Sequence, residues 1–408
     1  MRKLFNRELI FIFTVVGLAI MAMSLLQPVL PLYLTDIGIN PTALGLMFSV
    51  GMMGMVLGES AGGWLADRSG VKVPMLIGTF LCIPMVLAFV FIENTVALFA
   101  VFFFWGVVRA AIFGPGRGYI GTNIPLANKA TFMAVYATAM AISRALGTSA
   151  SGFVVDILKY DGVFVISAGI SLVGGFLAII GLKKRLPSRQ VEVSTSASTS
   201  TLNISPEPSM PLYRHQPFIV QSIVATLYFV AMGTNSFLSL LAVQKAGVPV
   251  AQVGILFTVG AIVNAVLLIP MGRLADYKSK RVLMIFGLLI TAAGFTGISF
   301  SSNFLQLAVS QIIASIGGSM FSPAAVTLLS ENIARHKQST AMGVYGGFED
   351  IGVIVGSALG GVVWSALGPT FTFLLVAAVP EVIGAGICIT LLKGKKVKQV
   401  SVQETVRR

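Results

Sequence analysis

Long apolar stretches separated by short polar breaks dominate the chain. Breaks at charged, polar or Gly/Pro clusters divide it into twelve hydrophobic segments, at residues 9–34, 42–65, 73–92, 96–121, 131–155, 162–182, 217–243, 250–272, 282–301, 304–330, 340–365 and 370–392. About 20 apolar residues in a helix span the hydrocarbon core of a bilayer. The apolar runs are continuous rather than alternating, which excludes a transmembrane barrel. We therefore expect an all-α membrane protein with twelve transmembrane helices.

Composition leads to the same conclusion. Of the 408 residues, 56% are hydrophobic and only 11% are charged, against about 25% charged residues in a typical soluble domain. Twelve spans leave no room for a large soluble domain. The first apolar run follows Arg2, Lys3 and Arg7, but it is too long for the apolar part of a signal peptide. We interpret it as a first span that is retained.

A segment of different composition lies between the sixth and seventh spans. Residues 186–216 are rich in Ser, Thr and Pro and contain few apolar residues, so they cannot form a core and are expected to be a flexible linker. The domain organisation that we predict is an N-terminal six-helix bundle at 1–185, this linker, a C-terminal six-helix bundle at 217–395, and a tail at 396–408.

The distribution of basic residues predicts the orientation. Of 28 Lys and Arg residues, 23 lie on the side of the two termini and the linker, and only Lys159 and Lys245 lie on the other side. Cytoplasmic loops carry such an excess, so we expect both termini and the linker in the cytoplasm of a multi-pass plasma-membrane protein. This topology accounts for the net charge of +13. A nucleic-acid partner is not expected, because the charges are scattered over short loops.

The two halves of the chain repeat one another at an offset of 209 residues. Gly63-Trp64-Leu65-Ala66-Asp67-Arg68 recurs as Gly272-Arg273-Leu274-Ala275-Asp276-Tyr277, and the same offset pairs Gly38 with Gly247 and Gly147 with Gly356. Two halves with an even number of spans have the same orientation in the membrane, which predicts a symmetry axis along the membrane normal.

The loop after the second span, Gly63 to Lys72, is similar to the major facilitator signature G-x-L-A-D-R-x-G-x-[KR], and every fixed position is met. The resemblance to this superfamily implies its fold of two six-helix bundles, alternating access and monomeric operation. It also implies that Asp67 latches the first half to the start of span eleven, and that Asp276 does the same toward span five. The gate would comprise Glu59, Gly63, Asp67, Arg68, Gly272 and Asp276. A topogenic loop that only holds charge in the cytoplasm is the alternative.

A second resemblance concerns the first span. Gln27-Pro28-Val29-Leu30-Pro31 is similar to the P-V-x-P pattern of the twelve-span drug/proton antiporters, although span five lacks the proline of that branch's G-P-x-x-G-G element and Phe102 replaces its usual arginine. The resemblance implies export of a small organic molecule in exchange for protons.

Four charged residues are expected near the midplane, where an ionised group costs several kcal/mol unless it has a partner or water. They are Arg109 and Arg144 in the first half and Glu349 and Asp350 in the second. Either the arginines bind an anionic substrate, or Glu349 or Asp350 carries a proton, or the four form a structural ion-pair network. Anion binding makes a proton-coupled symporter or exchanger of organic anions the alternative function.

Other polar and helix-breaking residues give weaker signals. Gln27, Tyr33 and Asn235 would line the cavity or join helices by hydrogen bonds, and Glu381 is expected to be structural. Gly114-Pro115-Gly116 and Pro323 predict helix breaks at matching depths in both halves, which act in gating or only kink the helices.

Motifs of catalysis and of metal or nucleotide binding are absent. The sequence has no H-E-x-x-H, no C-x-x-C and no phosphate-binding loop with lysine, so we expect no enzyme, no cofactor and no metal site. Cys82 and Cys388 lie in separate apolar runs and are expected to be buried small side chains. Uphill transport would have to be driven by an ion gradient, and a small-molecule substrate and protons are the expected partners.

Overall fold

The computed structural model describes residues 7–123, 126–182, 216–333 and 338–392, and within these ranges the chain is helical apart from short connecting turns. The first half contains α1 (Arg7–Leu26), α2 (Leu30–Asp36), α3 (Pro41–Ser69), α4 (Lys72–Phe91), α5 (Thr95–Asn123) and α6 (Leu126–Gly181). The second half contains α7 (Gln216–Thr234), η2 (Asn235–Phe237), α8 (Leu238–Leu240), η3 (Leu241–Lys245), α9 (Val250–Tyr277), α10 (Lys280–Phe300), α11 (Phe304–Asn332), α12 (Gln338–Leu367), α13 (Pro369–Phe371), η5 (Thr372–Ala378) and α14 (Val379–Leu391).

The described residues form eleven continuous helical segments that are long and apolar enough to cross a membrane. One of them, Val135–Gly181, has 47 residues, and a straight helix of that length would be about 70 Å long, twice the thickness of a bilayer. The chain reverses within it at Lys159, whose φ is 62°. This segment is therefore two spans, and the prediction of twelve is confirmed. The predicted linker and C-terminal tail lie almost wholly outside the described residues.

The helix bounds follow the internal repeat. α3 and α9 begin at residues 41 and 250, and α5 and α11 at residues 95 and 304, each pair 209 residues apart. Asn94 and Asn303 cap the second pair, with each side-chain oxygen accepting a backbone N–H of the first turn. Positive φ angles also recur at this offset, at Lys159 and Gly368 and at Gly38 and Gly247.

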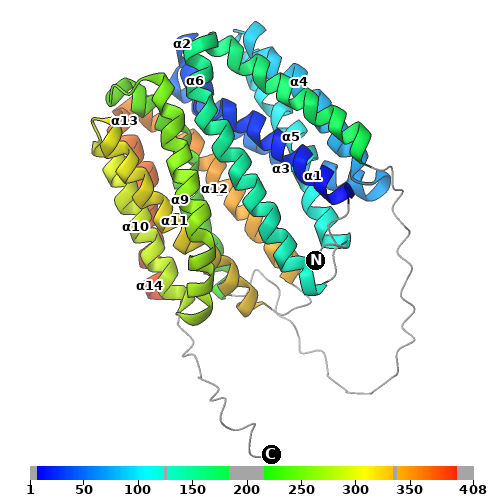
Figure 1. The fold of residues 1–408 in the computed structure, drawn as a ribbon. Helices are drawn as coiled ribbons and strands as arrows, with labels where there is room; N and C mark the ends of the chain where they lie inside the picture. Colours follow the sequence, from blue (N-terminus) through cyan, green and yellow to red (C-terminus); the bar gives the residue numbers. More distant parts are fainter. Residues whose placement is uncertain (1–6, 124–125, 183–215, 334–337, 393–408) are drawn as a thin grey trace, which may run out of the picture.

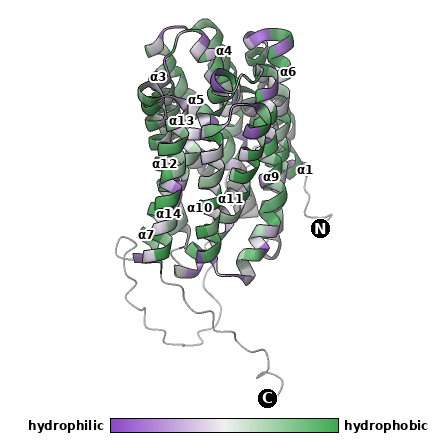
Figure 2. Cartoon of the chain, turned by 90° about the vertical axis from the view of Figure 1, so that its left-hand side faces the viewer, coloured by the Kyte–Doolittle hydropathy of each residue, from purple (hydrophilic) through white to green (hydrophobic). Residues whose placement is uncertain are grey.

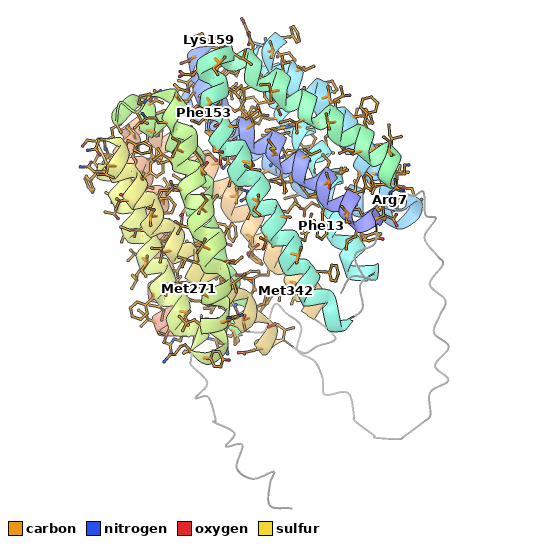
Figure 3. All side chains as sticks on the ribbon, in the orientation of Figure 1. Arg7, Phe13, Phe153, Lys159, Met271 and Met342 are labelled. Carbon is orange, nitrogen blue, oxygen red and sulfur yellow. The ribbon has the colours of Figure 1, made fainter. Side chains whose placement is uncertain are left out.

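The two bundles lie side by side, with all long helices running between two ends of the molecule (Figure 1). We call the end at which α1 and α7 begin the termini side, and the opposite end, which contains α2 and α13, the far side. Lys159 lies on the far side, and Met271 and Met342 lie toward the termini side (Figure 3). Hydrophobic residues cover the helices along most of their length, while hydrophilic residues gather near both ends (Figure 2), as expected of a chain that spans a bilayer.

Two seams join the bundles, and both use small residues in the far half of the helices. Where α3 meets α12, a Cβ added at Gly45 would lie 3.0 Å from the Cα of Gly361. Where α6 meets α9, a Cβ added at Gly152 would lie 2.6 Å from the carbonyl carbon of Ala251. Side chains larger than hydrogen would therefore hold the helices apart at both places.

Hydrogen bonds cross the same seams. The Ser49 hydroxyl donates to the Ile354 carbonyl oxygen at 2.7 Å, and the hydroxyls of Thr148 and Thr258 are 2.8 Å apart. These contacts stabilise the closed far side.

The bundles diverge toward the termini side (Figure 1). At Gly63 of α3, Gly272 of α9 and Gly346 of α12, an added Cβ would meet no heavy atom of the described residues within 4 Å. The molecule is thus closed between its bundles at the far side and open at the termini side.

The expected helix breaks at Pro115 and Pro323 are not found. Both prolines lie inside continuous helices, α5 and α11. Transmembrane helices tolerate proline where neighbouring helices, side chains or water satisfy the freed backbone groups. Gly114 and Gly116 are helical as well. Departures from α-helix occur instead between α1 and α2, in η2 and η3 after α7, and in η5. A gating role for the prolines stays a prediction.

Candidate functional site

Arg109 lies inside the first bundle, on α5. Its guanidinium carbon is 4.7 Å from the centre of the Trp105 ring, which is a cation–π contact. Its Nε is buried and has no hydrogen-bond partner among the described residues. The charges with which it interacts include that of Arg144, on α6. The structure thus brings the two predicted cations together, one of them buried.

The predicted carboxylates lie on α12 with separate neighbours. Asp350 is half-buried and interacts electrostatically with Glu59 of α3, across the interface between the bundles. Glu349 interacts with the side chains of Tyr228 and Tyr345. Glu59, which we expected only in the gate, therefore lies near a predicted site residue.

The other three predicted cavity residues lie in different environments. Gln27 is exposed in the turn between α1 and α2. The Tyr33 hydroxyl donates to the Phe89 carbonyl oxygen at 2.7 Å, inside the first bundle, so it joins helices, the second of the two roles considered for it. Asn235 lines a pocket.

Among the predicted gate residues, Gly63 and Gly272 face open space on the termini side. Arg68 stacks over Trp64 at 4.2 Å. Asp67 and Asp276 lie in α3 and α9, but their side chains are outside the described set. The latch between the halves stays a prediction.

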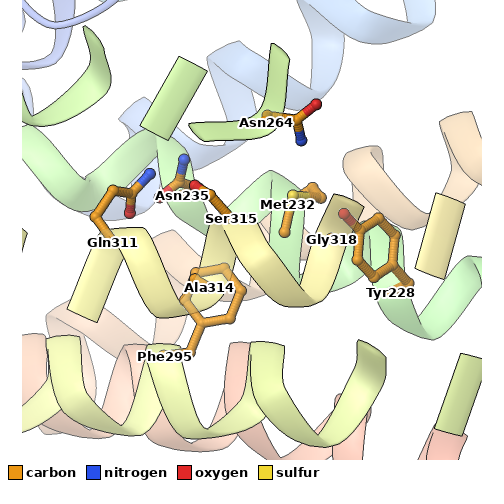
Figure 4. A pocket seen from close by; sticks show the side chains of 9 residues that line it. All are labelled: Tyr228, Met232, Asn235, Asn264, Phe295, Gln311, Ala314, Ser315 and Gly318. Atoms are coloured by element: carbon orange, nitrogen blue, oxygen red, sulfur yellow. The ribbon is translucent and has the colours of Figure 1, made fainter. Parts of the chain in front are cut away.

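A pocket of about 70 Å³ lies within the second bundle (Figure 4). Residues of α7, η2, α9, α10 and α11 line it: Tyr228, Met232, Asn235, Asn264, Phe295, Gln311, Ala314, Ser315 and Gly318. Three amide side chains, two hydroxyl groups and a thioether thus converge on one space. Two of its acceptors, Oδ1 of Asn235 and Oε1 of Gln311, are buried without a partner in the described part of the chain. Because a buried unpaired polar atom costs about 1–3 kcal/mol, these groups favour a ligand or water that donates hydrogen bonds.

The repeat explains why the second bundle has a pocket at this place. At the offset of 209, Phe102, Trp105 and Arg109 correspond to Gln311, Ala314 and Gly318. In the first bundle Phe102 and Trp105 are buried and pack edge-to-face with each other and with Phe89. Replacing two aromatic rings and a guanidinium by smaller groups removes volume from an otherwise equivalent core.

Sequence reasoning missed most of this pocket. Of its polar residues it proposed only Asn235; Tyr228, Asn264, Gln311 and Ser315 were not considered. The signal was available in the repeat, because a large side chain in one half that aligns with a small or polar one in the other marks a difference in packing. The sequence analysis selected Arg109 instead, because it is a charged residue inside a predicted span.

Comparisons with known proteins agree with the architecture. Residues 12–246 and residues 222–406 each match the family model of the Major Facilitator Superfamily. Multidrug resistance protein 1 of Bacillus subtilis is 24% identical over 363 residues, covering 88% of this chain and 90% of that protein. Quinolone resistance protein NorA of Staphylococcus aureus is 22% identical over 360 residues, covering 87% and 89%. A crystal structure of a mutant nucleoside transporter NupG has a TM-score of 0.78 at 14% identity, covering 95% of this chain and all of that one.

Proposed function

The chain belongs to the major facilitator superfamily, and we propose that it exports small organic molecules across the plasma membrane in exchange for protons. As a member of this family it is a multi-pass membrane transporter of small molecules and not an enzyme. The proton coupling, the direction and the substrate are what we propose here, together with operation as a monomer.

The observation that carries the proposal is the asymmetry of the interface between the bundles. Glycine and hydroxyl contacts close it at the far side, and the glycines of α3, α9 and α12 face open space at the termini side. With the basic termini side in the cytoplasm, this is the inward-open state of a transporter that works by alternating access. Rocking the two bundles would separate the glycine seams and expose the site to the far side.

The pocket of the second bundle supports a site for the substrate. Its amide and hydroxyl groups lie among Met232, Phe295 and Tyr228, a combination typical of small-molecule sites. Its volume of about 70 Å³ is below the roughly 300–1,000 Å³ of sites for drug-sized ligands, so in this state it would hold one group of a substrate and not the whole molecule. Asp350 and Glu59 face the interface from opposite bundles. Closing the termini side would bring the two carboxylates closer, and a proton on one of them would remove their repulsion. This makes Asp350, or its neighbour Glu349, a proton carrier.

Export is supported by the relatives. Those named for multidrug and quinolone resistance align with nearly nine-tenths of this chain, and a membrane transporter would confer resistance to a drug by moving it out of the cell. An exporter loads its substrate from the cytoplasm, which the inward-open state allows.

Organic anions are the second candidate substrate class. One observation favours them: the buried guanidinium of Arg109 interacts with a second cation, Arg144, and its Nε has no partner in the part of the chain that is described. Two guanidinium groups that interact electrostatically, one of them exposed, suit a carboxylate or a phosphate. Exchange or symport of such anions with protons would then replace drug export.

Thermal unfolding of the purified protein tests which class binds. The panel contains organic anions, neutral sugars and tetraphenylphosphonium as a lipophilic cation, added to wild type, Arg109→Gln and Gln311→Phe. A ligand of the folded state at 100 times its Kd stabilises by about 2.7 kcal/mol. The proposal predicts stabilisation by the cation that Gln311→Phe removes and Arg109→Gln retains. Stabilisation by anions that Arg109→Gln abolishes would instead establish the second candidate.

Transport in proteoliposomes tests coupling and its sign. An acidic lumen in a neutral buffer should drive accumulation of the bound compound by antiport, because protons leave as the compound enters. A collapsed gradient is the control. Accumulation only when the outer buffer is acidic would mean symport, and saturable uptake that ignores the gradient would refute proton coupling.

A further inference from the structure

Glu381 is the most deeply buried carboxyl group that the proposed cycle does not use. It lies on α14, none of its surface is exposed, and neither carboxyl oxygen has a hydrogen-bond partner within the described ranges. An ionised carboxylate in such a place costs far more than a neutral one, so a buried group of this kind takes up a proton. A carboxyl group that only fills space gains nothing over an apolar side chain of the same size.

The repeat shows that the fold does not require a carboxyl group there. Beyond η5, the two halves match at an offset of 210 instead of 209. A Cβ on Gly174 would meet Thr79, Leu18 and Val15, and one on Gly384 would meet their counterparts Leu288, Leu227 and Val224. The helices also end 210 residues apart, at Gly181 and Leu391. The structural counterpart of Glu381 is therefore Ser171.

The π-helix η5 causes this change of register. A π-helical turn contains an additional residue, which rotates everything after it by about 100° around the helix axis. Without it, Glu381 would take the place of Leu172, which is 41% exposed. With it, Glu381 takes the buried place of Ser171, whose hydroxyl donates to the Ser167 carbonyl oxygen at 3.0 Å. A π-helical insertion thus turns an unpaired carboxyl group into the bundle, and such insertions frequently mark functional positions.

Tyr228 of α7 links this position to the pocket. Its hydroxyl interacts electrostatically with Glu381 and with Glu349, and its ring stacks on Phe321 at 4.4 Å. The same residue lines the pocket beside Gly318 (Figure 4). On the elements packed against α14, the other charged groups are Arg281 and Lys280 at the start of α10, near the termini side. Arg281 donates to the Cys388 and Ile389 carbonyl oxygens, and Lys280 pairs with Glu331 of α11. Cys388, on α14 itself, is buried.

We propose that Glu381 is a proton-binding residue of the transport cycle, which exchanges its proton with the pocket through the Tyr228 hydroxyl. In the inward-open state the carboxyl group is protonated. In this structure neither Glu381 oxygen is hydrogen-bonded to the Tyr228 hydroxyl, so the transfer requires a rearrangement that brings the two groups into contact. The carboxyl proton then passes to the Tyr228 oxygen while the Tyr228 proton passes to water in the pocket, which leaves a carboxylate and a hydronium ion. This inference rests on the proposed proton coupling and adds a site to it that Glu349 and Asp350 do not provide.

Infrared spectroscopy of the protein in lipid tests this without any substrate. The C=O stretch of a protonated carboxyl group is separate from the amide bands. Wild type near neutral pH should show such a band, and the difference between wild type and Glu381→Gln, which keeps the shape and removes the proton, isolates the contribution of Glu381 from those of Glu349 and Asp350. This contribution should decrease in Gly152→Ala and in Gly45→Ala, two variants in separate seams that favour the outward-open state. Absence of the band in wild type, or equal intensity in all conformations, would overturn the proposal and leave Glu381 a structural group.

Exchange into D₂O tests the path through Tyr228, because deuteration shifts the same band. Tyr228→Phe retains the ring on Phe321 and removes the hydroxyl, so exchange at Glu381 should slow by about tenfold or more, as expected when a relay is lost. Tyr345→Phe, at a buried tyrosine outside the pocket, is the control. Unchanged exchange in Tyr228→Phe would refute the relay. Because neither measurement involves transport, they remain decisive even if the proteoliposomes show no proton coupling.

Discussion

A single methyl group at Gly152 should open the far side of the molecule. The Cβ of Gly152→Ala would lie 2.6 Å from the Ala251 carbonyl carbon, where ordinary contacts begin at 3.4 Å. The bundles must therefore separate by at least 0.8 Å at this point (3.4 − 2.6). Overpacking of this kind costs about 1–3 kcal/mol. Because α6 and α9 belong to different bundles, the cost falls on the closed seam rather than on either fold.

The expected change in population follows from that energy. Since 1.4 kcal/mol is a factor of ten, the ratio of outward-open to inward-open protein should rise by about 5- to 150-fold. The reporter is Ser49→Cys, in the other seam, where Ser49 is only 4% exposed. Cys82 and Cys388 are buried and contribute a slow background. The alkylation rate of the reporter by a hydrophilic maleimide measures the open fraction.

Two controls separate opening from damage. Gly169→Ala, in the next span of the same bundle, would meet no atom of the described residues within 4 Å, and should leave labelling unchanged. Gly356→Ala places a Cβ 2.7 Å from the Val230 carbonyl carbon within the second bundle, so it should lower the melting temperature without selectively exposing Ser49→Cys. If Gly152→Ala folds normally and labels no faster than its parent, the seam does not hold the far side closed and our reasoning is wrong.

Three further predictions concern the pocket and the surface. Gln311→Phe introduces the aromatic residue that the first bundle has at the equivalent position, Phe102. It should abolish stabilisation by ligand and leave the melting temperature of the unliganded protein equal or higher, and a large loss of stability would contradict the equivalence of the two cores. Thr148→Val removes the 2.8 Å bond to Thr258 and should shift the open-to-closed ratio by about 0.5–1.5 kcal/mol, with no additional effect of Thr258→Val in a double-mutant cycle. Lys280→Gln breaks a 3.0 Å ion pair with Glu331, whose side chain is 51% exposed. It should change the free energy of unfolding, measured by denaturation in detergent, by less than about 1 kcal/mol, and a larger loss would point to a role beyond a surface pair.

Much of the architecture was predictable because the bilayer imposes it. Backbone groups in lipid have to be satisfied within each helix, so apolar runs of sufficient length give the spans directly. The repeat then predicted two like bundles, and the offset of 209 holds at most helix starts. Local geometry was less predictable: Pro115 and Pro323 were expected to break helices, and both helices continue through them.

The candidate site was predictable only in part. Sequence reasoning identified Arg109, Glu349 and Asp350 because charge is rare and costly in a membrane. It missed the pocket, which depends on the volume that Gln311 and Ala314 leave beside Tyr228. It also assigned Glu381 a structural role, because the one-residue shift at η5 that turns it into the bundle leaves no mark in the hydropathy.

The sequence by itself thus determined which segments cross the membrane, how they repeat and which end of the molecule is basic, because hydropathy, periodicity and charge act locally along the chain. Only the tertiary structure decided which end of the interface is closed, where the second bundle is hollow and which way Glu381 faces. Those properties depend on contacts between helices far apart in the sequence, and there a change of one methyl group or one residue of register decides what fits.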